Sequence, residues 1–313
     1  MNNLVVSYSA LKARNLVPPR LYFIYRKLMR IIGGHGFGRF YPVRVADSAI
    51  DWILRPRVAE VMGHKMFLDP SDSLHLSLTD AYEPLETSVV RQLVHPGDTV
   101  LDVGANIGYY TLLLAKLVGE QGRVFAFEPE PENFKLLQKN VALSGYGNVV
   151  LIPKAASNFT GTARLYLSDC NKGDHRMCDS GESRDSISIS TVRVDDELGD
   201  LKRPVRFIKM DIQGHEANAL QGMNELLTRN YVVSLLSEFW PVGLKRSGVD
   251  PAAYLSWFAG SRFSLYHLND LRNTVEALDL VSLLGPESVR EEYYTNILAT
   301  RGTGYVPTGG EQR

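Results

Sequence analysis

Two stretches decide the fold of this chain: TVLDVGANIGYYT at residues 99–111 and VFAFEP at residues 124–129. The pattern predicts a buried strand, a glycine turn, a helix and a second strand that ends at the carboxylate of Glu128. Gly104 allows a tight turn out of the first strand, and Gly108 allows a ligand or the sheet to approach the helix closely. The two stretches therefore predict a parallel βαβ unit.

The charge and spacing of this turn indicate a ligand. Glu128 stands where a βαβ unit places an acid against a ribose diol. The glycines are spaced G-x-x-x-G, unlike the G-x-G-x-x-G that holds a pyrophosphate, and Asp102 adds negative charge where a dinucleotide phosphate would lie. The alternative is that these glycines are only those found at the strand-to-helix turns of any parallel sheet. An acidic turn suits S-adenosylmethionine, whose sulfonium and ammonium groups are cationic. The residues predicted to bind it here are Asp102, Gly104, Asn106, Gly108, Thr111, Glu128 and Pro129.

Three motifs resemble those of the FkbM-type S-adenosylmethionine-dependent methyltransferases. They are DVGANIG at 102–108, FEPEPENF at 127–134 with Leu137 and Asn140 after it, and FIKMDIQGHE at 207–216. The resemblance covers roughly residues 58–300 and is most specific from 96 to 240. Gln213 stands where the family often has Glu, and His215 where it often has a small residue. These departures leave the assignment of an acid or base open.

The alternation of strand and helix patterns predicts the α/β class. With the resemblance, it implies a Rossmann-like class I methyltransferase fold with a mostly parallel seven-stranded sheet, a closing antiparallel hairpin and an N-terminal helical and hairpin extension. We expect short strands around Gly63, a single helix that contains Ala219 to Leu227, and the closing pair at 263–267 and 295–300. The predicted domains are a basic extension with an amphipathic helix at 1–57, the methyltransferase domain at 58–300 with an antiparallel insertion at 161–194, and a disordered tail at 301–313.

Composition excludes some classes of protein. The 313 residues are 44% hydrophobic, enough for a sizeable core, and the net charge of −1 argues against a nucleic-acid binder. No signal peptide or apolar run of membrane-spanning length is evident, so we expect a cytoplasmic protein. Two cysteines, Cys170 and Cys178, are expected to be reduced thiols, although a disulfide between them stays open. Composition makes no prediction of oligomeric state.

The first 60 residues carry ten Lys or Arg against three acids. Apolar residues at helical spacing predict an amphipathic helix at 16–32. The basic helix would touch a membrane surface or a phosphorylated carrier, or it would pack on the catalytic domain with its charges solvated. The segment 33–38 is expected to be a flexible connector.

Reacting groups are expected where the parallel strands end, at the carboxyl edge of the sheet. Asp102, Glu128, Asp211 and Glu238 converge there by position. Asp211 is the first candidate for the reacting centre: it would contact the methionine ammonium of the cofactor, orient an acceptor hydroxyl or bind a divalent cation with Glu238. Its alternative role is to cap the helix that opens at Gly214.

Two histidines are the further catalytic candidates because they titrate near neutral pH. His215 starts a helix, and His175 lies in a polar loop between Asp174 and Arg176, a trio suited to gripping a hydroxyl, a carboxylate or a phosphate. A divalent cation is conceivable because carboxylate oxygens suit such an ion. The sequence shows no compact cluster of ligands, so no metal is predicted.

By resemblance, other segments line the same site. Ala155 would flank the adenine, or simply pack. Glu83 and Glu86 lie in a segment that would cover the cofactor or the substrate, and surface charge accounts for both acids equally well.

The function expected is S-adenosylmethionine-dependent methyl transfer, by O-methylation of a small hydroxylated acceptor. By resemblance this acceptor is a sugar, a glycan-linked sugar or a natural product. A nicotinamide-dependent oxidoreductase on a similar sheet and a non-catalytic cofactor-binding scaffold are the alternatives; Gln213 favours the scaffold.

Overall fold

The computed structural model describes residues 24–25, 56–79, 81–168, 171–179, 181, 183–305 and 307. The chain divides into two compact units, Met1–Tyr82 and Glu83–Arg313, and each is described by itself. The predicted helix at 16–32 lies outside the described residues except for Ile24 and Tyr25, which are helical, with Ile24 exposed. The predicted connector at 33–38 and residues 308–313 of the predicted tail also lie outside them.

The described part of the first unit contains a hairpin. Strands β1 (Val58–Val61) and β2 (His64–Phe67) pair antiparallel on either side of the expected turn. Met62 and Gly63 both have positive φ, 51° and 80°, which is the backbone of the tight hairpin turn that matches the twist of two strands.

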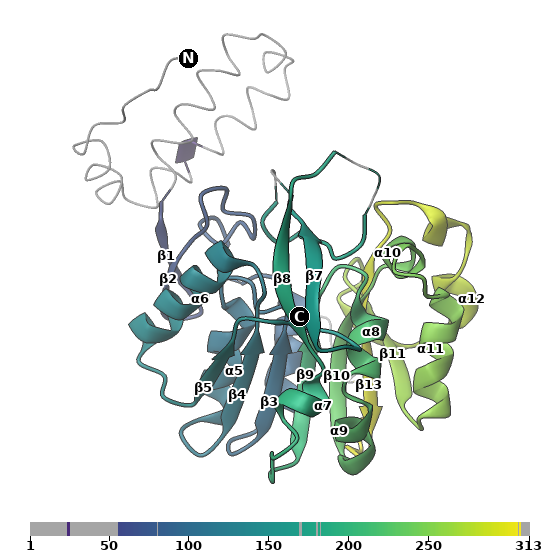
Figure 1. Ribbon diagram of the computed structural model, residues 1–313. Helices are drawn as coiled ribbons and strands as arrows, with labels where there is room; N and C mark the ends of the chain where they lie inside the picture. Colours follow the sequence, from purple (N-terminus) through teal and green to yellow (C-terminus); the bar gives the residue numbers. More distant parts are fainter. Residues whose placement is uncertain are drawn as a thin grey trace, which may run out of the picture. The chain divides into compact units, whose positions relative to one another are not determined.

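The second unit is built on one large sheet with the strand order β12-β11-β13-β10-β9-β3-β4-β5 (Figure 1). The central strands β10, β9, β3, β4 and β5 are parallel, and β13 is antiparallel to both β10 and β11. The bounds are β3 Thr99–Val103, β4 Arg123–Phe127, β5 Val149–Ile152, β9 Val205–Met210, β10 Val233–Phe239, β11 Ser264–Asn269, β12 Thr274–Ala277 and β13 Thr295–Arg301. The predicted fold class is confirmed. The sheet has eight strands in this part of the chain rather than seven, because β12 pairs with β11.

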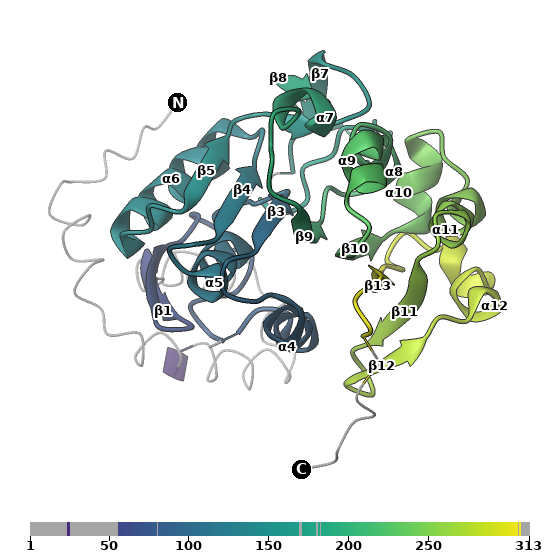
Figure 2. The same ribbon diagram turned by 90° about the horizontal axis from the view of Figure 1, so that it is seen from below.

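Helices cover both faces of this sheet (Figure 2). Helices α4 (Pro84–Leu93) and α5 (Tyr109–Val118) lie on one side, and α8 (Glu216–Gln221), α9 (Asn224–Arg229) and α11 (Pro251–Gly260) lie on the other. The core on the α8–α11 side includes Leu101, Ile208, Leu235, Leu220 and Phe258. Since side chains alternate along a strand, the residues next to these in sequence, Asp102 and Lys209 among them, point to the side of α4 and α5. The remaining helices are α6 (Pro131–Ser144), α7 (Val194–Glu197), α10 (Pro241–Arg246), α12 (Leu280–Leu283) and the 3₁₀ turn η3 (Pro286–Val289).

The expectation of one helix through Ala219 to Leu227 is wrong, because the chain forms α8 and then α9. At Gly222 a Cβ atom would lie 1.8 Å from the carbonyl oxygen of Ser157, so the backbone passes too close for a side chain. The carboxylate of Asp195 then accepts hydrogen bonds from the amides of Glu225 (3.0 Å) and Leu226 (2.8 Å). This acid caps the second helix from outside and allows it to start again.

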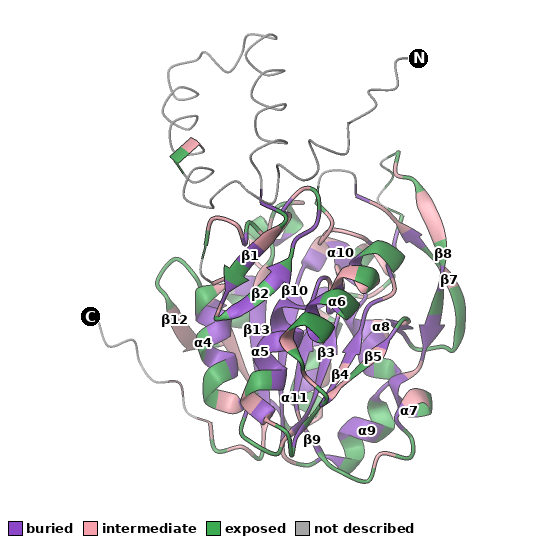
Figure 3. Cartoon of the chain, turned by 90° about the vertical axis from the view of Figure 1, so that its left-hand side faces the viewer, coloured by how far each residue is buried: buried purple, intermediate pink, exposed green. Residues whose placement is uncertain are grey.

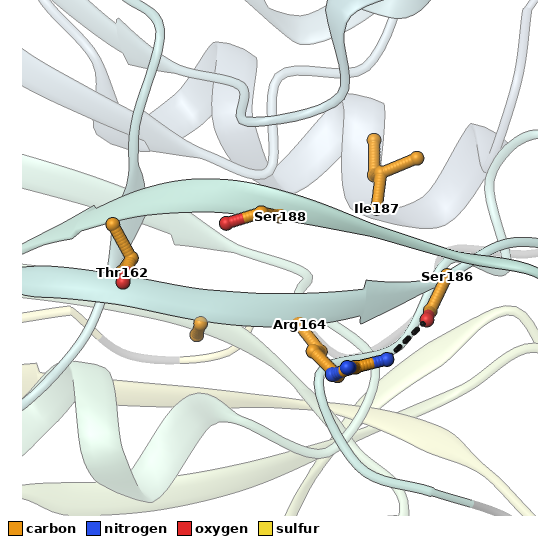
Figure 4. A pocket seen from close by; sticks show the side chains of 6 residues that line it. Thr162, Arg164, Ser186, Ile187 and Ser188 are labelled. Carbon is orange, nitrogen blue, oxygen red and sulfur yellow. Dashed lines mark hydrogen bonds between the residues drawn. The ribbon is translucent and has the colours of Figure 1, made fainter.

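A separate sheet contains β6 (Ala155–Ala156), β8 (Ser186–Val192) and β7 (Gly161–Tyr166), in that order. β7 and β8 pair antiparallel, as expected between 161 and 194, whereas β6 pairs parallel with β8. Residues of β7 and β8 are mostly exposed or half-buried, in contrast to the fully buried β3 (Figure 3). A hollow of about 430 Å³ on this ribbon is lined by short side chains and by Arg164, which donates to the Ser186 hydroxyl at 3.2 Å (Figure 4). The hollow contains none of the predicted site residues.

Candidate active site

The turn after β3 is held between the ends of two neighbouring strands. The amides of Gly104 and Ala105 donate to the carbonyl of Phe127 at the end of β4, and the amide of Asp211 donates to the carbonyl of Val103. Gly104 has φ +87°, and a Cβ atom there would lie 1.9 Å from the carbonyl oxygen of Asp211. Only glycine fits at this point, where the ends of β3, β4 and β9 meet.

Gly108 allows a close approach by a neighbouring helix. A Cβ atom at this residue would lie 2.8 Å from Cδ1 of Leu137, so the glycine allows α6 to pack against the start of α5. The close protein neighbour is therefore a helix side chain rather than the sheet, and the approach of a ligand stays a prediction. Asn140 of the same helix donates its amide to the carbonyl of Ile107 at 2.8 Å, which fixes the turn further.

Glu128 is bound directly to the glycine turn. Its Oε2 accepts the amide of Asn106 at 2.7 Å, and its Oε1 accepts the amide of Glu130 at 2.9 Å. Burial raises the pKa of this carboxyl group to about 8. Pro129, which follows, is half-buried. Sequence reasoning thus placed Glu128 beside the turn correctly, and its contact with a ribose stays a prediction.

Asp102 lies behind the turn. It is 1% exposed, and its carboxylate accepts the hydroxyl of Thr111, which is also fully buried. Burial raises the pKa of Asp102 to about 6. The hydrogen bond between these two residues fixes the first turn of α5 to β3. It also leaves a titratable carboxyl group directly behind the glycine turn.

At the ends of β9 and β10, Gln213 joins two carboxylates. Its Nε2 donates to Oδ1 of Asp211 at 3.0 Å and lies 3.3 Å from Oε1 of Glu238. Asp211 is 27% exposed, whereas Glu238 is buried, and burial followed by the charges of Asp211 and Glu216 raises the pKa of Glu238 well above its ordinary value. The neutral amide of Gln213 thus bridges the two carboxyl groups.

Asp211 does not cap the helix that follows it, which was its alternative role. Oε1 of Glu216 accepts the amides of Ile212 at 3.0 Å and Gly214 at 3.2 Å. Glu216 is fully buried, and burial raises its pKa to about 7. Since Glu216 satisfies these amides, the carboxylate of Asp211 contacts Gln213 and Lys209 instead.

Sequence reasoning missed Lys209 as a site residue. Its side chain is 1% exposed, Nζ lies 3.6 Å from Oδ2 of Asp211, and Nζ lies 5.0 Å from the centre of the Tyr110 ring. Burial lowers the pKa of Lys209, but the neighbouring carboxylates, that of Asp211 foremost, outweigh it, and the pKa rises above its ordinary value. Lys209 is therefore a cation held among acids. The signal in the sequence is a lysine inside the otherwise apolar run FIKM.

Helix α4 and the residue that precedes it contribute two more acids to this side of the sheet. Glu83 accepts the hydroxyl of Tyr110 at 2.7 Å. Glu86 is fully buried, and its Oε1 accepts the side-chain amide of Asn296 from β13 at 2.9 Å. Burial, followed by the charge of Glu83, raises the pKa of Glu86 to about 7. For Glu86 the alternative of plain surface charge is therefore wrong.

The hydrogen bonds of the two candidate histidines go to residues other than Asp211. His215 is buried, with Nε2 3.0 Å from the hydroxyl of Ser157 and Nδ1 3.0 Å from the amide of Asn218. Burial lowers its pKa to about 4, so the ring is neutral at pH 7. His175 accepts the amide of Ser168 through Nδ1 at 3.0 Å, and burial lowers its pKa as well. The catalytic roles of these histidines stay predictions.

The other predicted residues near the loop are engaged in packing. Arg176 pairs with Asp174 at 2.7 Å and with Glu291 at 3.2 Å, and its guanidinium lies 4.3 Å from the centre of the Trp240 ring. Ala155 is buried in a small cluster with Leu165 and Ile189 of the ribbon. The trio around His175 is thus held internally, and Ala155 packs in the position that was expected to flank an adenine.

Three further findings concern groups named from the sequence. Among the described residues, no group of three or more His, Cys, Asp or Glu side chains is placed to hold a metal ion. In the same part of the chain, no helix has both the length and the apolar character needed to cross a bilayer. Cys178 is a buried free thiol.

The family model described as the methyltransferase FkbM domain matches residues 102–258. The chain is 31% identical over 173 residues to the hexuronic acid methyltransferase AglP of Haloferax volcanii, covering 53% of this chain and 64% of the relative. It is 28% identical over 165 residues to Methyltransferase 1 of Beauveria bassiana, covering 45% of this chain and 66% of the relative. The chain thus spans just under two thirds of the length of these two relatives.

Among solved structures, the methyltransferase FkbM of Methylobacillus flagellatus is similar at 16% identity, with a TM-score of 0.39 over 73% of this chain and 52% of that one. The strand order described above, and not this likeness, carries the assignment of the fold.

Proposed function

This chain belongs to the FkbM methyltransferase family, and we propose that it transfers a methyl group from S-adenosylmethionine to a hydroxyl group of a small acceptor. One observation carries the proposal: the glycine turn at 104–108 is fixed against a buried acid, since Asn106 donates its amide to Glu128 at 2.7 Å. A glycine turn after one strand and an acid at the end of the neighbouring strand form the arrangement that holds a nucleoside in open α/β sheets.

The proposed cofactor site consists of the residues that meet at this turn. Gly104 and Asn106 would present backbone to the cofactor, Glu128 would accept the ribose hydroxyls, and Asp211 would face the methionine portion from the end of β9. Asp102, Thr111 and Gly108 would act indirectly, because they fix α5 behind the turn. S-adenosylmethionine supplies an activated methyl group on a sulfonium.

The proposed acceptor is a sugar or another small hydroxylated molecule. The name of the relative in Haloferax volcanii supports a sugar, since that protein is a hexuronic acid methyltransferase. Methyl transfer is an in-line displacement, so much of the rate arises from holding donor and acceptor close and aligned. Asp211 is partly exposed and held by Gln213, and we propose that it orients the acceptor hydroxyl and assists the loss of its proton.

Calorimetric titration of the purified protein with S-adenosylmethionine and, separately, with NADH tests the cofactor. Saturable binding of S-adenosylmethionine alone is the expected result, and it is followed by a screen of hydroxylated acceptors for formation of S-adenosylhomocysteine. Binding of NADH alone would replace the proposal with an oxidoreductase. Binding of S-adenosylmethionine without turnover on any acceptor would instead favour a cofactor-binding scaffold.

A further inference from the structure

Residues 171–176, with the sequence NKGDHR, form a short segment between β7 and β8 that we call the strap. The carboxylate of Asp174 accepts hydrogen bonds from Nε of Arg176 at 2.7 Å and from NH2 of Arg184 at 2.9 Å. The backbone of Arg176 pairs with that of Tyr166 at the end of β7. These contacts brace the strap within itself and against β7, so the strap and the end of β7 can move as one unit.

One end of the strap is fastened beside the acid that is predicted to bind the ribose. The side-chain amide of Asn133, in the first turn of α6, donates to the carbonyl of Lys172 at 3.0 Å. The backbone amide of Asn133 donates to Glu130 at 2.6 Å, and the amide of Glu130 donates to Glu128 at 2.9 Å. A continuous series of hydrogen bonds therefore joins Glu128, at the end of β4, to the strap.

The other end of the strap is fastened beyond β10. NH1 of Arg176 donates to Oε1 of Glu291 at 3.2 Å, and NH1 of Arg246 from α10 donates to the same oxygen at 2.5 Å. Trp240, which directly follows β10, donates Nε1 to the carbonyl of Glu291 at 3.0 Å. The guanidinium of Arg176 also lies 4.3 Å from the centre of the Trp240 ring. Glu291 therefore joins the strap to the end of β10.

These two fastenings determine what the strap spans. In the sheet, β9 and β3 lie between β10 and β4, so the ends of β10 and β4 are three strand spacings apart, about 14 Å. The four residue steps from Lys172 to Arg176 extend to at most about 14 Å, and the side chains of Asn133 and Arg176 supply further reach. The strap therefore spans the carboxyl ends of β3 and β9, where Gly104 and Asp211 meet.

In this position the strap leaves one buried donor unused. Nδ1 of His175 accepts the amide of Ser168, so in the neutral ring the proton is on Nε2. Nε2 is buried and has no hydrogen-bond partner among the described residues. Buried polar groups are normally paired, and an unpaired donor costs free energy. Lifting the strap would let water satisfy Nε2, so this cost opposes the fastenings that hold the strap down.

We propose that the strap is a lid, which closes over S-adenosylmethionine bound at the glycine turn, opens to admit and release it, and is latched by Glu291. This inference rests on the proposed function and adds a conformational step to it. The fastenings at both ends are hydrogen bonds and ion pairs, for which water substitutes when the strap lifts. A lid of this kind shields the reacting groups from water while the cofactor is bound.

The latch is tested by the rates at which S-adenosylhomocysteine binds to and leaves the full chain, measured by stopped-flow fluorescence. Glu291→Ala is expected to raise both the association and the dissociation rate constants by about tenfold or more, because the strap then opens more often with and without ligand. Damage to the binding site would instead lower association while it raises dissociation. Glu287→Ala is the matched control: Glu287 is 59% exposed, pairs with Arg290 at 2.6 Å, and should leave both rates unchanged.

A second measurement follows the strap without altering its latch. Cys178, two residues beyond the strap, is 8% exposed, and Cys170→Ser leaves it as the single thiol of a chain with two cysteines. Saturation with S-adenosylhomocysteine is expected to slow the reaction of Cys178 with Ellman's reagent by about tenfold or more, since the bound ligand favours the closed strap. Glu291→Ala in the same background should accelerate this reaction.

The outcomes separate the lid from the proposed function. Unchanged thiol reactivity in protein that binds S-adenosylhomocysteine would overturn the lid and leave the proposed function standing. An association rate that is unchanged or lower in Glu291→Ala would overturn the role of Glu291 as the latch. Failure of S-adenosylhomocysteine to bind the wild-type protein would remove both the lid and the proposed function.

Discussion

The α-carbon of Gly104 lies against the carbonyl of Asp211, so that a Cβ atom at residue 104 would be 1.9 Å from that oxygen. The backbone of the predicted cofactor turn and the backbone of the predicted catalytic acid therefore pack as one unit. Gly104→Ala is expected to lower the free energy of unfolding by more than about 3 kcal/mol and to abolish binding of S-adenosylmethionine. Chemical denaturation and calorimetry measure the two effects.

Gly97 provides the control for that substitution. It also has a positive φ, +89°, but no atom lies within 4 Å of the place where its Cβ would be. Gly97→Ala should therefore cost only about 1 kcal/mol, the backbone penalty alone, and should leave the cofactor affinity unchanged. Equal costs at both glycines would show that the contact with Asp211 does not matter.

Glu128→Gln is expected to weaken binding of S-adenosylhomocysteine by about 1–3 kcal/mol, because the charge-assisted contact with the ribose is lost. In the wild-type protein the pKa of Glu128 is about 8, so its charged form is a minority at pH 7 and increases up to pH 9. Affinity should rise over this range in the wild-type protein and stay flat in the variant. Calorimetric titrations at three pH values measure this, and a parallel rise in both proteins would exclude Glu128 from the ribose contact.

Local signals were sufficient to predict the central fold. The run 99–111 has a buried strand, two glycines and an apolar helix in direct succession, and each step depends on neighbours in sequence. The same holds for the placement of Glu128 beside the turn. The break at Gly222 was missed because the contacts made there, with the carbonyl of Ser157 and with the capping carboxylate of Asp195, come from residues distant in sequence.

The polar side of the sheet was not predictable in the same way. Glu86 and Asn296 are hydrogen-bonded across a separation of 210 residues, and no local pattern pairs an acid of one helix with an amide of the last strand. Lys209 stands in an apolar strand without a nearby acid in sequence other than Asp211. Besides Asp211, the carboxylates that act on the charge of Lys209 are those of Glu83, Glu86 and Glu238. Glu83 precedes α4, Glu86 lies in α4 and Glu238 lies in β10. Such a cluster depends on tertiary packing, which periodicity does not encode.

Asp211→Asn is expected to reduce kcat on the identified acceptor by about 10²-fold or more, because the amide cannot assist loss of the proton. The affinity for S-adenosylmethionine should change much less, since the amide keeps the size of the side chain and can still accept from Gln213. Steady-state kinetics and calorimetry separate the two effects. Asp200→Asn, in an exposed loop, should leave both unchanged. A full-rate Asp211→Asn enzyme would remove Asp211 from the chemistry.

Glu86→Gln is expected to make the protein more stable at alkaline pH. The pKa of Glu86 is about 7 in the folded protein, against an ordinary 4.5, so the folded state holds its proton more tightly than the unfolded state. The stability associated with that proton is fully present below pH 4.5 and is lost as the pH rises through 7. Glutamine cannot ionise and keeps an oxygen that accepts from Asn296, so it avoids this loss.

The two proteins should therefore have similar stability at pH 5 and differ by about 2 kcal/mol at pH 8.5, with the variant the more stable. Urea denaturation at intervals between these pH values measures the difference. Glu120→Gln, at an exposed position, is the matched control and should run parallel to the wild-type protein at every pH. A constant difference between Glu86→Gln and wild type across the range would mean that Glu86 does not titrate there. A loss of stability that grows with pH would show instead that its buried negative charge is needed by Lys209.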